Sequence, residues 1–198
     1  MNRARVKDYT SNNTIMSIEL TKTSTKNLNI SIDGTPIKIK VSMSAMPFGF
    51  SVTDYGGYGP SKNLNISIED DDVIDTIRTI ETNVLMELSN ISQDIFHRQV
   101  DMDELITMFN SNLTEDGRLR IKHTKDTVIF DESGKVMHPA IFDGDFAKWS
   151  TTCNFIVSGL YFMNKKIGLI LKANHVRLFE PKKESSGYMF LDSESDSD

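Results

Sequence analysis

The closing stretch Cys153-Asn-Phe-Ile-Val-Ser-Gly-Leu-Tyr-Phe-Met-Asn-Lys-Lys-Ile-Gly-Leu-Ile-Leu-Lys-Ala-Asn-His-Val-Arg-Leu-Phe179 decides the fold. Two apolar runs, residues 153–162 and 167–179, lie on either side of the polar turn Met163–Lys166. Runs of this length that are rich in β-branched and aromatic residues, and are separated by a short turn, predict two antiparallel strands. We therefore expect a β-rich chain that ends in a hairpin.

Shorter strand candidates lie in the first part of the chain. Residues 15–20 form one strand-like run, and residues 28–32 form a second in which apolar and polar residues alternate. Asp33-Gly34 is a strong signal for a hairpin turn. We therefore expect residues 37–43 to return beside residues 28–32. Their alternation places four apolar residues on one face: Ile37, Ile39, Val41 and Met43.

The middle of the chain adds a loop and further strands. Residues 45–60 are rich in glycine and aromatic residues, which favours a loop with short extended pieces. Residues 62–69 match residues 26–33 at seven of eight positions, which predicts two strands in similar environments. Residues 117–123 form a basic strand candidate, and the runs on either side of Glu132-Ser-Gly134 predict a hairpin.

A helical segment separates these strands. Asp70, Asp71 and Asp72 suit a helix N-terminus, and apolar residues then recur every three or four positions as far as Ile95. Residues 101–110 predict a second, shorter helix. We expect an α+β fold, mainly β, with a small barrel in residues 15–181 and a helical insertion at about residues 70–112. Residues 1–14 are predicted to be a flexible N-terminus.

Charge is distributed unevenly along the chain. The formal net charge is −6, but residues 184–198 hold five acids and no base, so the remaining 23 acids nearly balance 22 bases. Residues 69–116 carry thirteen acids and two bases, whereas residues 118–183 carry twelve bases and six acids. This segregation predicts one basic surface that could face phosphate groups.

The sequence has none of the usual catalytic or metal-binding motifs. It contains no glycine-rich phosphate loop, no Cys-x-x-Cys and no His-Glu-x-x-His, and its four histidines are scattered. The single cysteine, Cys153, begins an apolar strand, so we expect a buried, unreactive thiol in a reducing, intracellular compartment. No apolar run approaches the ~20 residues of a membrane span. We therefore expect no enzyme activity, no cofactor, no metal and no membrane contact.

Basic and aromatic residues are interleaved in the loops and in the closing hairpin. Grooves for single-stranded nucleic acid follow phosphates with Lys and Arg and stack bases on aromatic rings. The only tryptophan, Trp149, suits either the core or such a stacking site. The candidate nucleic-acid-binding residues are Lys38, Lys40, Phe50, Tyr55, Tyr58, Arg118, Arg120, Lys122, Lys148, Trp149, Tyr161, Lys165, Lys166, Lys172 and Arg177.

Residues 182–198 form an acidic tail in which a short apolar patch is followed by acids. Such a segment cannot build a core, so we expect it to be disordered. It could compete with DNA for a basic groove, bind a basic partner or serve only to increase solubility. The candidate partner-binding residues are Tyr188, Phe190, Leu191, Asp192, Glu194, Asp196 and Asp198.

Four pieces of the sequence resemble the OB-fold single-stranded DNA-binding proteins of phages and large DNA viruses. They are Pro47-Phe-Gly-Phe-Ser51; Lys62-Asn-Leu-Asn-Ile-Ser-Ile68 with the helix after it; Phe155 to Gly168 with Lys172 and Val176-Arg-Leu178; and Gly187-Tyr-Met-Phe-Leu-Asp192. The resemblance implies a five-stranded OB-like barrel and sequence-independent binding of single-stranded DNA.

The resemblance also implies a role at a viral replication site in the host cell, in replication, recombination or repair. The tail would then contact viral replication proteins such as a polymerase or helicase. Formation of a homo-oligomer remains open. A viral structural or scaffolding protein whose tail binds basic partners remains the alternative.

Overall fold

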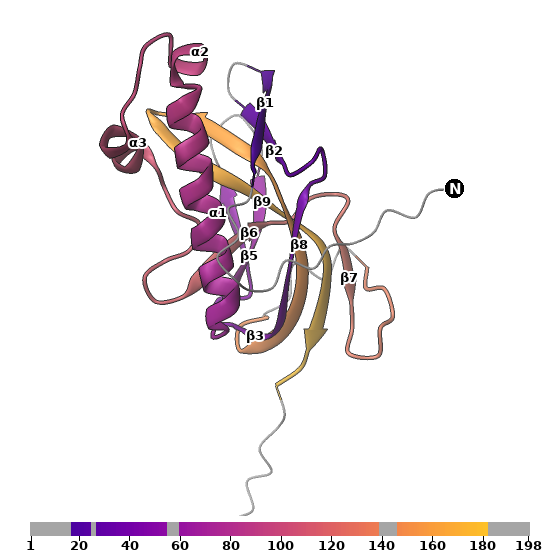
Figure 1. The fold of residues 1–198 in the computed structure, drawn as a ribbon. Helices are drawn as coiled ribbons and strands as arrows, with labels where there is room; N and C mark the ends of the chain where they lie inside the picture. Colours follow the sequence, from indigo (N-terminus) through magenta and orange to yellow (C-terminus); the bar gives the residue numbers. More distant parts are fainter. Residues whose placement is uncertain (1–16, 25–26, 55–59, 139–145, 182–198) are drawn as a thin grey trace, which may run out of the picture.

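The computed structural model describes residues 17–24, 27–54, 60–138 and 146–181. The predicted flexible N-terminus and the acidic tail lie outside these residues. The described part is mainly β with three helices, which confirms the α+β, mainly β prediction (Figure 1). Its elements are β1 (Glu19–Ser24), β2 (Asn27–Ser31), β3 (Ile37–Met46), β4 (Phe50–Asp54), β5 (Pro60–Ser67), α1 (Asp71–Asn90), α2 (Ser92–Phe96), α3 (Met102–Met108), β6 (Arg118–Lys122), β7 (Val128–Phe130), β8 (Trp149–Met163) and β9 (Lys166–Phe179).

Five of the strands pair in a closed ring. Antiparallel pairs join β3 to β5, β5 to β6, β9 to β8 and β8 to β3, and β6 runs parallel to β9. The ring encloses side chains that alternate inward along each strand, such as Leu64, Ile66, Leu119, Ile121 and Phe155, each at most 1% exposed. β1 and β2 extend one side of the ring, and β4 and β7 lie at other edges.

The β8–β9 hairpin is the longest paired unit, as the closing stretch predicts. Its strands begin and end close to the predicted limits, except that β8 begins four residues earlier, at Trp149. Asn164 and Lys165 form the turn with φ of 52° and 60°. Two successive residues at positive φ are typical of the two-residue turns whose twist matches that of a hairpin.

The turn at Asp33-Gly34 is present, but the hairpin expected around it is not. Ile32 and Thr35 exchange backbone hydrogen bonds of 3.0 and 2.9 Å across the turn. However, β2 pairs with β8 at residues 159–161, and β3 pairs with the same strand at residues 149–157. β2 and β3 therefore pair with successive parts of β8, and the turn connects them. The prediction that residues 37–43 return beside residues 28–32 was wrong.

Two further strand predictions need correction. β1 begins at Glu19, so the strand lies later than the predicted residues 15–20, and it pairs with β2. In β3, Met43 does not join Ile37 on the buried face; it is 62% exposed with φ of 48°. The register against β8 shifts between Val41 and Ser44, and this bulge moves Met43 outward and Ser44 inward.

The helices lie along one side of the strands (Figure 1). Asp70 caps α1 as predicted, because its Oδ1 accepts hydrogen bonds from the backbone N–H groups of Asp72 and Val73. The predicted apolar stripe supplies the buried face of α1, but the helix ends at Asn90. Ile91 separates it from the short α2, which ends at Phe96 and is followed by His97 in the left-handed conformation.

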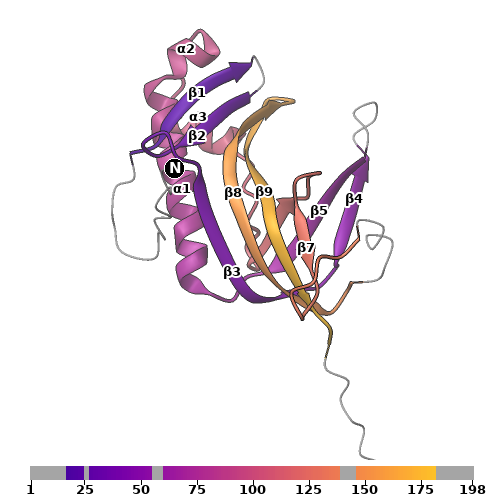
Figure 2. The same cartoon turned by 90° about the vertical axis from the view of Figure 1, so that its right-hand side faces the viewer.

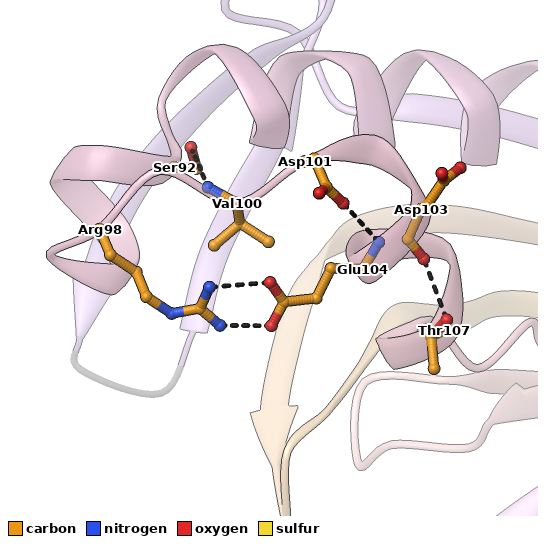
Figure 3. A network of polar contacts seen from close by, with 7 residues as sticks. All are labelled: Ser92, Arg98, Val100, Asp101, Asp103, Glu104 and Thr107. Atoms are coloured by element: carbon orange, nitrogen blue, oxygen red, sulfur yellow. Dashed lines mark hydrogen bonds and ion pairs between the residues drawn. The ribbon is translucent and has the colours of Figure 1, made fainter.

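Polar contacts fix the link from α2 to α3 (Figure 3). The Arg98 guanidinium donates two hydrogen bonds to the Glu104 carboxylate, and Ser92 Oγ accepts a bond of 3.2 Å from the Val100 N–H. Asp101 caps α3 by accepting a bond of 2.8 Å from the Glu104 N–H. Among the described helices, none is both long and apolar enough to cross a membrane.

Candidate nucleic-acid interface

A line of outward-facing residues crosses four strands of the ring. Lys38 on β3 lies opposite Ile156 on β8, and Ile156 lies opposite Lys172 on β9. Lys172 in turn is the bridge partner of Lys122 on β6. Residues opposite one another on paired strands both point out of the ring, and neighbouring strands lie about 4.8 Å apart. Because the strands close into a ring, the outward direction turns from one strand to the next, so this line follows the outside of the ring from β3 to β6. We call Lys38, Lys172 and Lys122 the basic row.

The basic row is not neutralised by its surroundings. Lys38 and Lys122 are exposed and Lys172 is half-buried, while Ile39, Leu171 and Ile121 beside them are buried. Lys40 lies two residues along β3 on the same face, opposite Asn154. Within the described part of the chain, the ammonium groups of Lys38, Lys40, Lys122 and Lys172 form no hydrogen bond or ion pair. Such groups can bind phosphate without first breaking a contact there.

The outward face of β6 continues the basic surface along the strand. Arg118 and Arg120 share this face with Lys122, since they are spaced by two residues. The Nε of Arg118 forms an ion pair of 2.7 Å with Asp116 Oδ2. Its guanidinium carbon also lies 5.4 Å from the centre of the Phe48 ring. Arg118 is therefore oriented by two neighbours, and Phe48 lies at the same end of the strand.

Phe48 is an exposed aromatic ring that our sequence reasoning left out of the site. It is 60% exposed in the turn between β3 and β4. Gly49 follows it with φ of 59°, and a Cβ there would lie 2.9 Å from the backbone of Phe146. The chain must therefore turn tightly at Gly49, which leaves Phe48 on the surface. The Pro-Phe-Gly sequence could have indicated this turn.

Phe50, which we predicted to bind nucleic acid, is packed against other rings. It meets Phe146 edge-on, with ring centres 5.6 Å apart, and His123 at 6.5 Å. Trp149 likewise meets Phe146 edge-on at 4.9 Å. Burial lowers the pKa of His123, and the positive charge of Lys62 adds to this shift. The structure thus places Phe50 and Trp149 in one partly buried aromatic cluster around Phe146.

Tyr161 lies on the β8–β9 hairpin and covers a glycine. A Cβ at Gly168 would fall 2.6 Å from the Tyr161 hydroxyl, so the ring occupies the space above this glycine. The hydroxyl accepts a hydrogen bond of 3.4 Å from Asn110 Nδ2. The Asn110 N–H also donates to the Ile167 carbonyl at 2.7 Å. Tyr161 therefore helps to join the segment after α3 to the hairpin.

Four further predicted cations lie away from the basic row. Lys166 Nζ donates to the Thr107 carbonyl at 3.0 Å and so stabilises the last turn of α3. Arg177 Nη2 donates to the Glu132 carbonyl at 2.5 Å, which holds the loop after β7. Lys148 and Lys165 are exposed in turns, with φ of 70° and 60°. The predicted Tyr55 and Tyr58, and all the predicted tail residues, lie outside the described residues.

The other groups that could react or bind a metal have environments that packing explains. Cys153 is fully buried, as predicted, and burial raises the pKa of its thiol to about 12. Burial also raises the pKa of Glu81 on α1, against the opposing effect of a 2.7 Å hydrogen bond from Ser111 Oγ. In the described ranges, no three His, Cys, Asp or Glu side chains come together as a metal site would require.

Comparison with known proteins finds similar solved structures but no match by sequence. No protein-family model matches this sequence, and no curated protein matches it. One similar solved structure is the single-stranded DNA-binding protein from bacteriophage Enc34 in complex with ssDNA. It is 9% identical with a TM-score of 0.48, over 84% of this chain and 97% of that chain.

A second similar structure is gp2.5, a single-stranded DNA binding protein encoded by bacteriophage T7. It is 14% identical with a TM-score of 0.45, over 76% of this chain and 96% of that chain. Both are described as single-stranded DNA-binding proteins of bacteriophages.

Proposed function

We propose that this protein binds single-stranded DNA without sequence preference, with the basic row as the centre of its contact surface. The observation that carries the proposal is the alignment of Lys38, Lys172 and Lys122 across paired strands, with no neutralising group among the described residues. Lysine contacts with phosphate position a strand but do not read bases. Binding through such a row is therefore expected to be independent of sequence and sensitive to salt.

We further infer that the five-stranded ring is an OB-type barrel. Its single-bridge contacts, Ala45 with Ser67 and Lys122 with Lys172, suit a barrel that is partly open. OB folds bind oligonucleotides on the face of their second and third strands, which in the ring are β5 and β6. That face carries Asn65, Arg120 and Lys122. The basic row ends on this face, which supports the assignment.

Phe48 supplies an aromatic platform for a single strand. Bases of a single strand are unpaired and can stack on an exposed ring, whereas those of a duplex are already stacked. Phe48 lies over the same face of β6 as Arg118. Arg118 is four residues from Lys122, which corresponds to roughly 13 Å along a strand. A strand could therefore stack a base on Phe48 while its phosphates follow the basic surface.

The acidic tail is assigned a regulatory role in this proposal. Residues 184–198 carry five acids and no base, so they can compete with DNA for the basic row. Tyr188, Phe190 and Leu191 are suitable apolar anchors for a replication protein. The sequence resemblance supports a role in viral DNA replication, recombination or repair inside the host cell.

We propose binding rather than catalysis. The histidines lie on separate elements: His97 follows α2, His123 follows β6, His138 follows β7 and His175 lies on β9. The Cys153 thiol is unsuited to act as a nucleophile, because its pKa of about 12 leaves it protonated at neutral pH.

The test is a titration of labelled single-stranded and duplex oligonucleotides, followed by fluorescence anisotropy at low salt. Full-length protein is compared with a variant that lacks residues 184–198. We expect both to bind the single strand more tightly than the duplex, and the shortened protein to bind more tightly than the full-length protein. Failure of both to bind at low salt would overturn the proposed function and favour a scaffolding role.

A further inference from the structure

Two side-chain rings on β7 and β9 lie together on the outer surface, beyond one end of the basic row. β7 pairs in parallel with β9, so that Val128 lies opposite His175. In β7, Ile129 is 4% exposed and faces the core, so Val128 and Phe130 point outward. The Phe130 and His175 rings lie 6.0 Å apart and are tilted by 34°. We call Phe130 and His175 the β7 platform.

The β7 platform has an open face and an apolar neighbour. Phe130 is half-buried and His175 is exposed. Val136, the bridge partner of Phe130 in the next arm of the chain, is 60% exposed. Rings and an apolar side chain that reach solvent together offer a flat apolar surface, which suits the face of an unpaired base.

Hydrogen bonds fix the turn that follows Phe130. The Asp131 carboxylate accepts a bond of 2.6 Å from Ser133 Oγ and one of 2.9 Å from the Lys135 N–H. Arg177 on β9 holds the same turn through the Glu132 carbonyl. The platform is therefore held in place before any ligand binds, which reduces the entropy cost of binding.

β6 and β7 lie one after the other along the same edge of β9. β8 pairs with the opposite edge over most of β9, and both β6 and β7 run parallel to β9. Their bridges with β9 begin only three residues apart, at Lys172 for β6 and at His175 for β7. In the link between them, Thr127 Oγ1 donates a bond of 2.7 Å to the Ala173 carbonyl. Figure 2 shows β7 beside β9, away from the hairpin tip.

The basic row and the β7 platform share the outer face of β9. Lys172 and His175 are an odd number of residues apart, which would place them on opposite faces of a regular strand. However, the register against β8 shifts between Asn154 and Phe155, and this bulge turns His175 outward, while Ala173 is 2% exposed. One direction therefore leads along β6 to Lys172 and on to the platform.

We propose that a single strand of DNA runs from Phe48 across the basic row to the β7 platform, where a second base stacks on Phe130. The distance along β6 is roughly 13 Å and the three residues along β9 add roughly 10 Å. Stacked nucleotides rise about 3.4 Å each, so the path covers no more than about seven nucleotides. This inference rests on the proposed function and adds the course of the strand and a second stacking site.

Two variants test the platform. Phe130→Leu retains an apolar side chain and removes the aromatic face, whereas His175→Ala removes an exposed ring and should not affect folding. Phe162→Leu is the matched control, because it makes the same change at a half-buried ring near the hairpin tip. Fluorescence anisotropy at low salt measures binding of oligothymidylates of about four and about twelve nucleotides, which bracket the range of one OB fold. Urea unfolding shows that each variant is folded.

We expect Phe130→Leu to bind the longer strand roughly 5-fold to 100-fold more weakly than wild type, the equivalent of one stacked base. His175→Ala should also weaken this binding, by a smaller factor, and Phe162→Leu should match wild type. The shorter strand should be affected little, because it can bind at the Phe48 end alone.

Wild-type affinity of both platform variants for the longer strand would overturn the inference, and so would an equal loss of affinity for both lengths. If Phe130→Leu does not fold, His175→Ala decides by the same criteria. Absence of DNA binding by wild type is a different result, which would overturn the proposed function itself.

Discussion

Two phenylalanines that are two residues apart have different environments. Phe48 is exposed and lies under the Arg118 guanidinium, whereas Phe50 packs edge-on against Phe146. We expect Phe48→Ala to weaken single-stranded DNA binding by about 1–3 kcal/mol, the usual value of one stacked base, and to leave stability nearly unchanged. Anisotropy titration and urea unfolding measure the two effects.

Phe50→Ala is the matched comparison for this prediction. Because its ring is partly buried, its loss should reduce the free energy of unfolding by on the order of 2 kcal/mol. Equal DNA affinity for Phe48→Ala and wild type would show that Phe48 does not contribute to DNA binding. The Phe-Gly-Phe pattern alone could not assign these roles, because they depend on the contact of Gly49 and Phe50 with Phe146.

Glu81 should make stability depend on pH. Burial raises its pKa in the folded protein above the usual 4.5. The folded protein therefore binds this proton more tightly than the unfolded chain does, and stability falls as the pH rises from about 4.5 through the raised pKa. Glu81→Gln removes the charge and retains a side-chain oxygen that can accept the Ser111 hydrogen bond.

We expect the melting temperature of Glu81→Gln to exceed that of wild type by more at pH 7 than at pH 4.5. Glu115→Gln, at an exposed carboxylate before β6, is the control and should show no such change. A difference in melting temperature between Glu81→Gln and wild type that stays constant from pH 4.5 to pH 7 would contradict the raised pKa of Glu81.

At the scale of elements, the contact between β2 and β8 depends on one glycine. A Cβ at Gly159 would lie 2.2 Å from the Leu28 carbonyl oxygen, and backbone on a paired strand cannot move aside. Gly159→Ala should therefore destabilise the protein by about 1–3 kcal/mol, as overpacking does. Urea unfolding measures this loss.

Gly168→Ala on the facing strand provides the comparison. The added Cβ would meet the Tyr161 side chain, which can rotate away and give up its contact with Asn110. We expect a smaller loss of stability for this variant than for Gly159→Ala. The reverse order would show that the β2–β8 contact is looser than described.

The elements that local signals control could be predicted from the sequence. The β8–β9 hairpin follows from two apolar runs and a turn, and α1 and α3 follow from caps at Asp70 and Asp101. The pairing of β2 and β3 could not be predicted in the same way. Asp33-Gly34 encodes a tight turn, but β2 and β3 both pair with β8 instead of with each other. Because β8 lies more than a hundred residues later, local sequence signals do not indicate this pairing.

At the scale of the whole molecule, charge segregation in the sequence predicted a basic surface after residue 117. In the structure, strand pairing in the five-stranded ring brings only some of those basic residues together. Lys122 and Lys172 are fifty residues apart in sequence and become bridge partners, and Lys38 joins them from outside the basic region. The parallel pairing of β6 with β9 places Lys122 beside Lys172, and no local sequence pattern indicates this pairing. In contrast, Lys166 and Arg177 hold neighbouring segments.

The most direct test of the central claim is the salt dependence of single-stranded DNA binding. Wild type is compared with the triple variant K38Q/K122Q/K172Q, and K125Q serves as a control at an exposed lysine outside the row. For single strands, each neutralised phosphate contributes about −0.7 to the slope of log K against log salt. We expect the triple variant to bind more weakly, with a slope shallower by about 2, and the control to match wild type. A triple variant that binds with the affinity and slope of wild type would contradict the account.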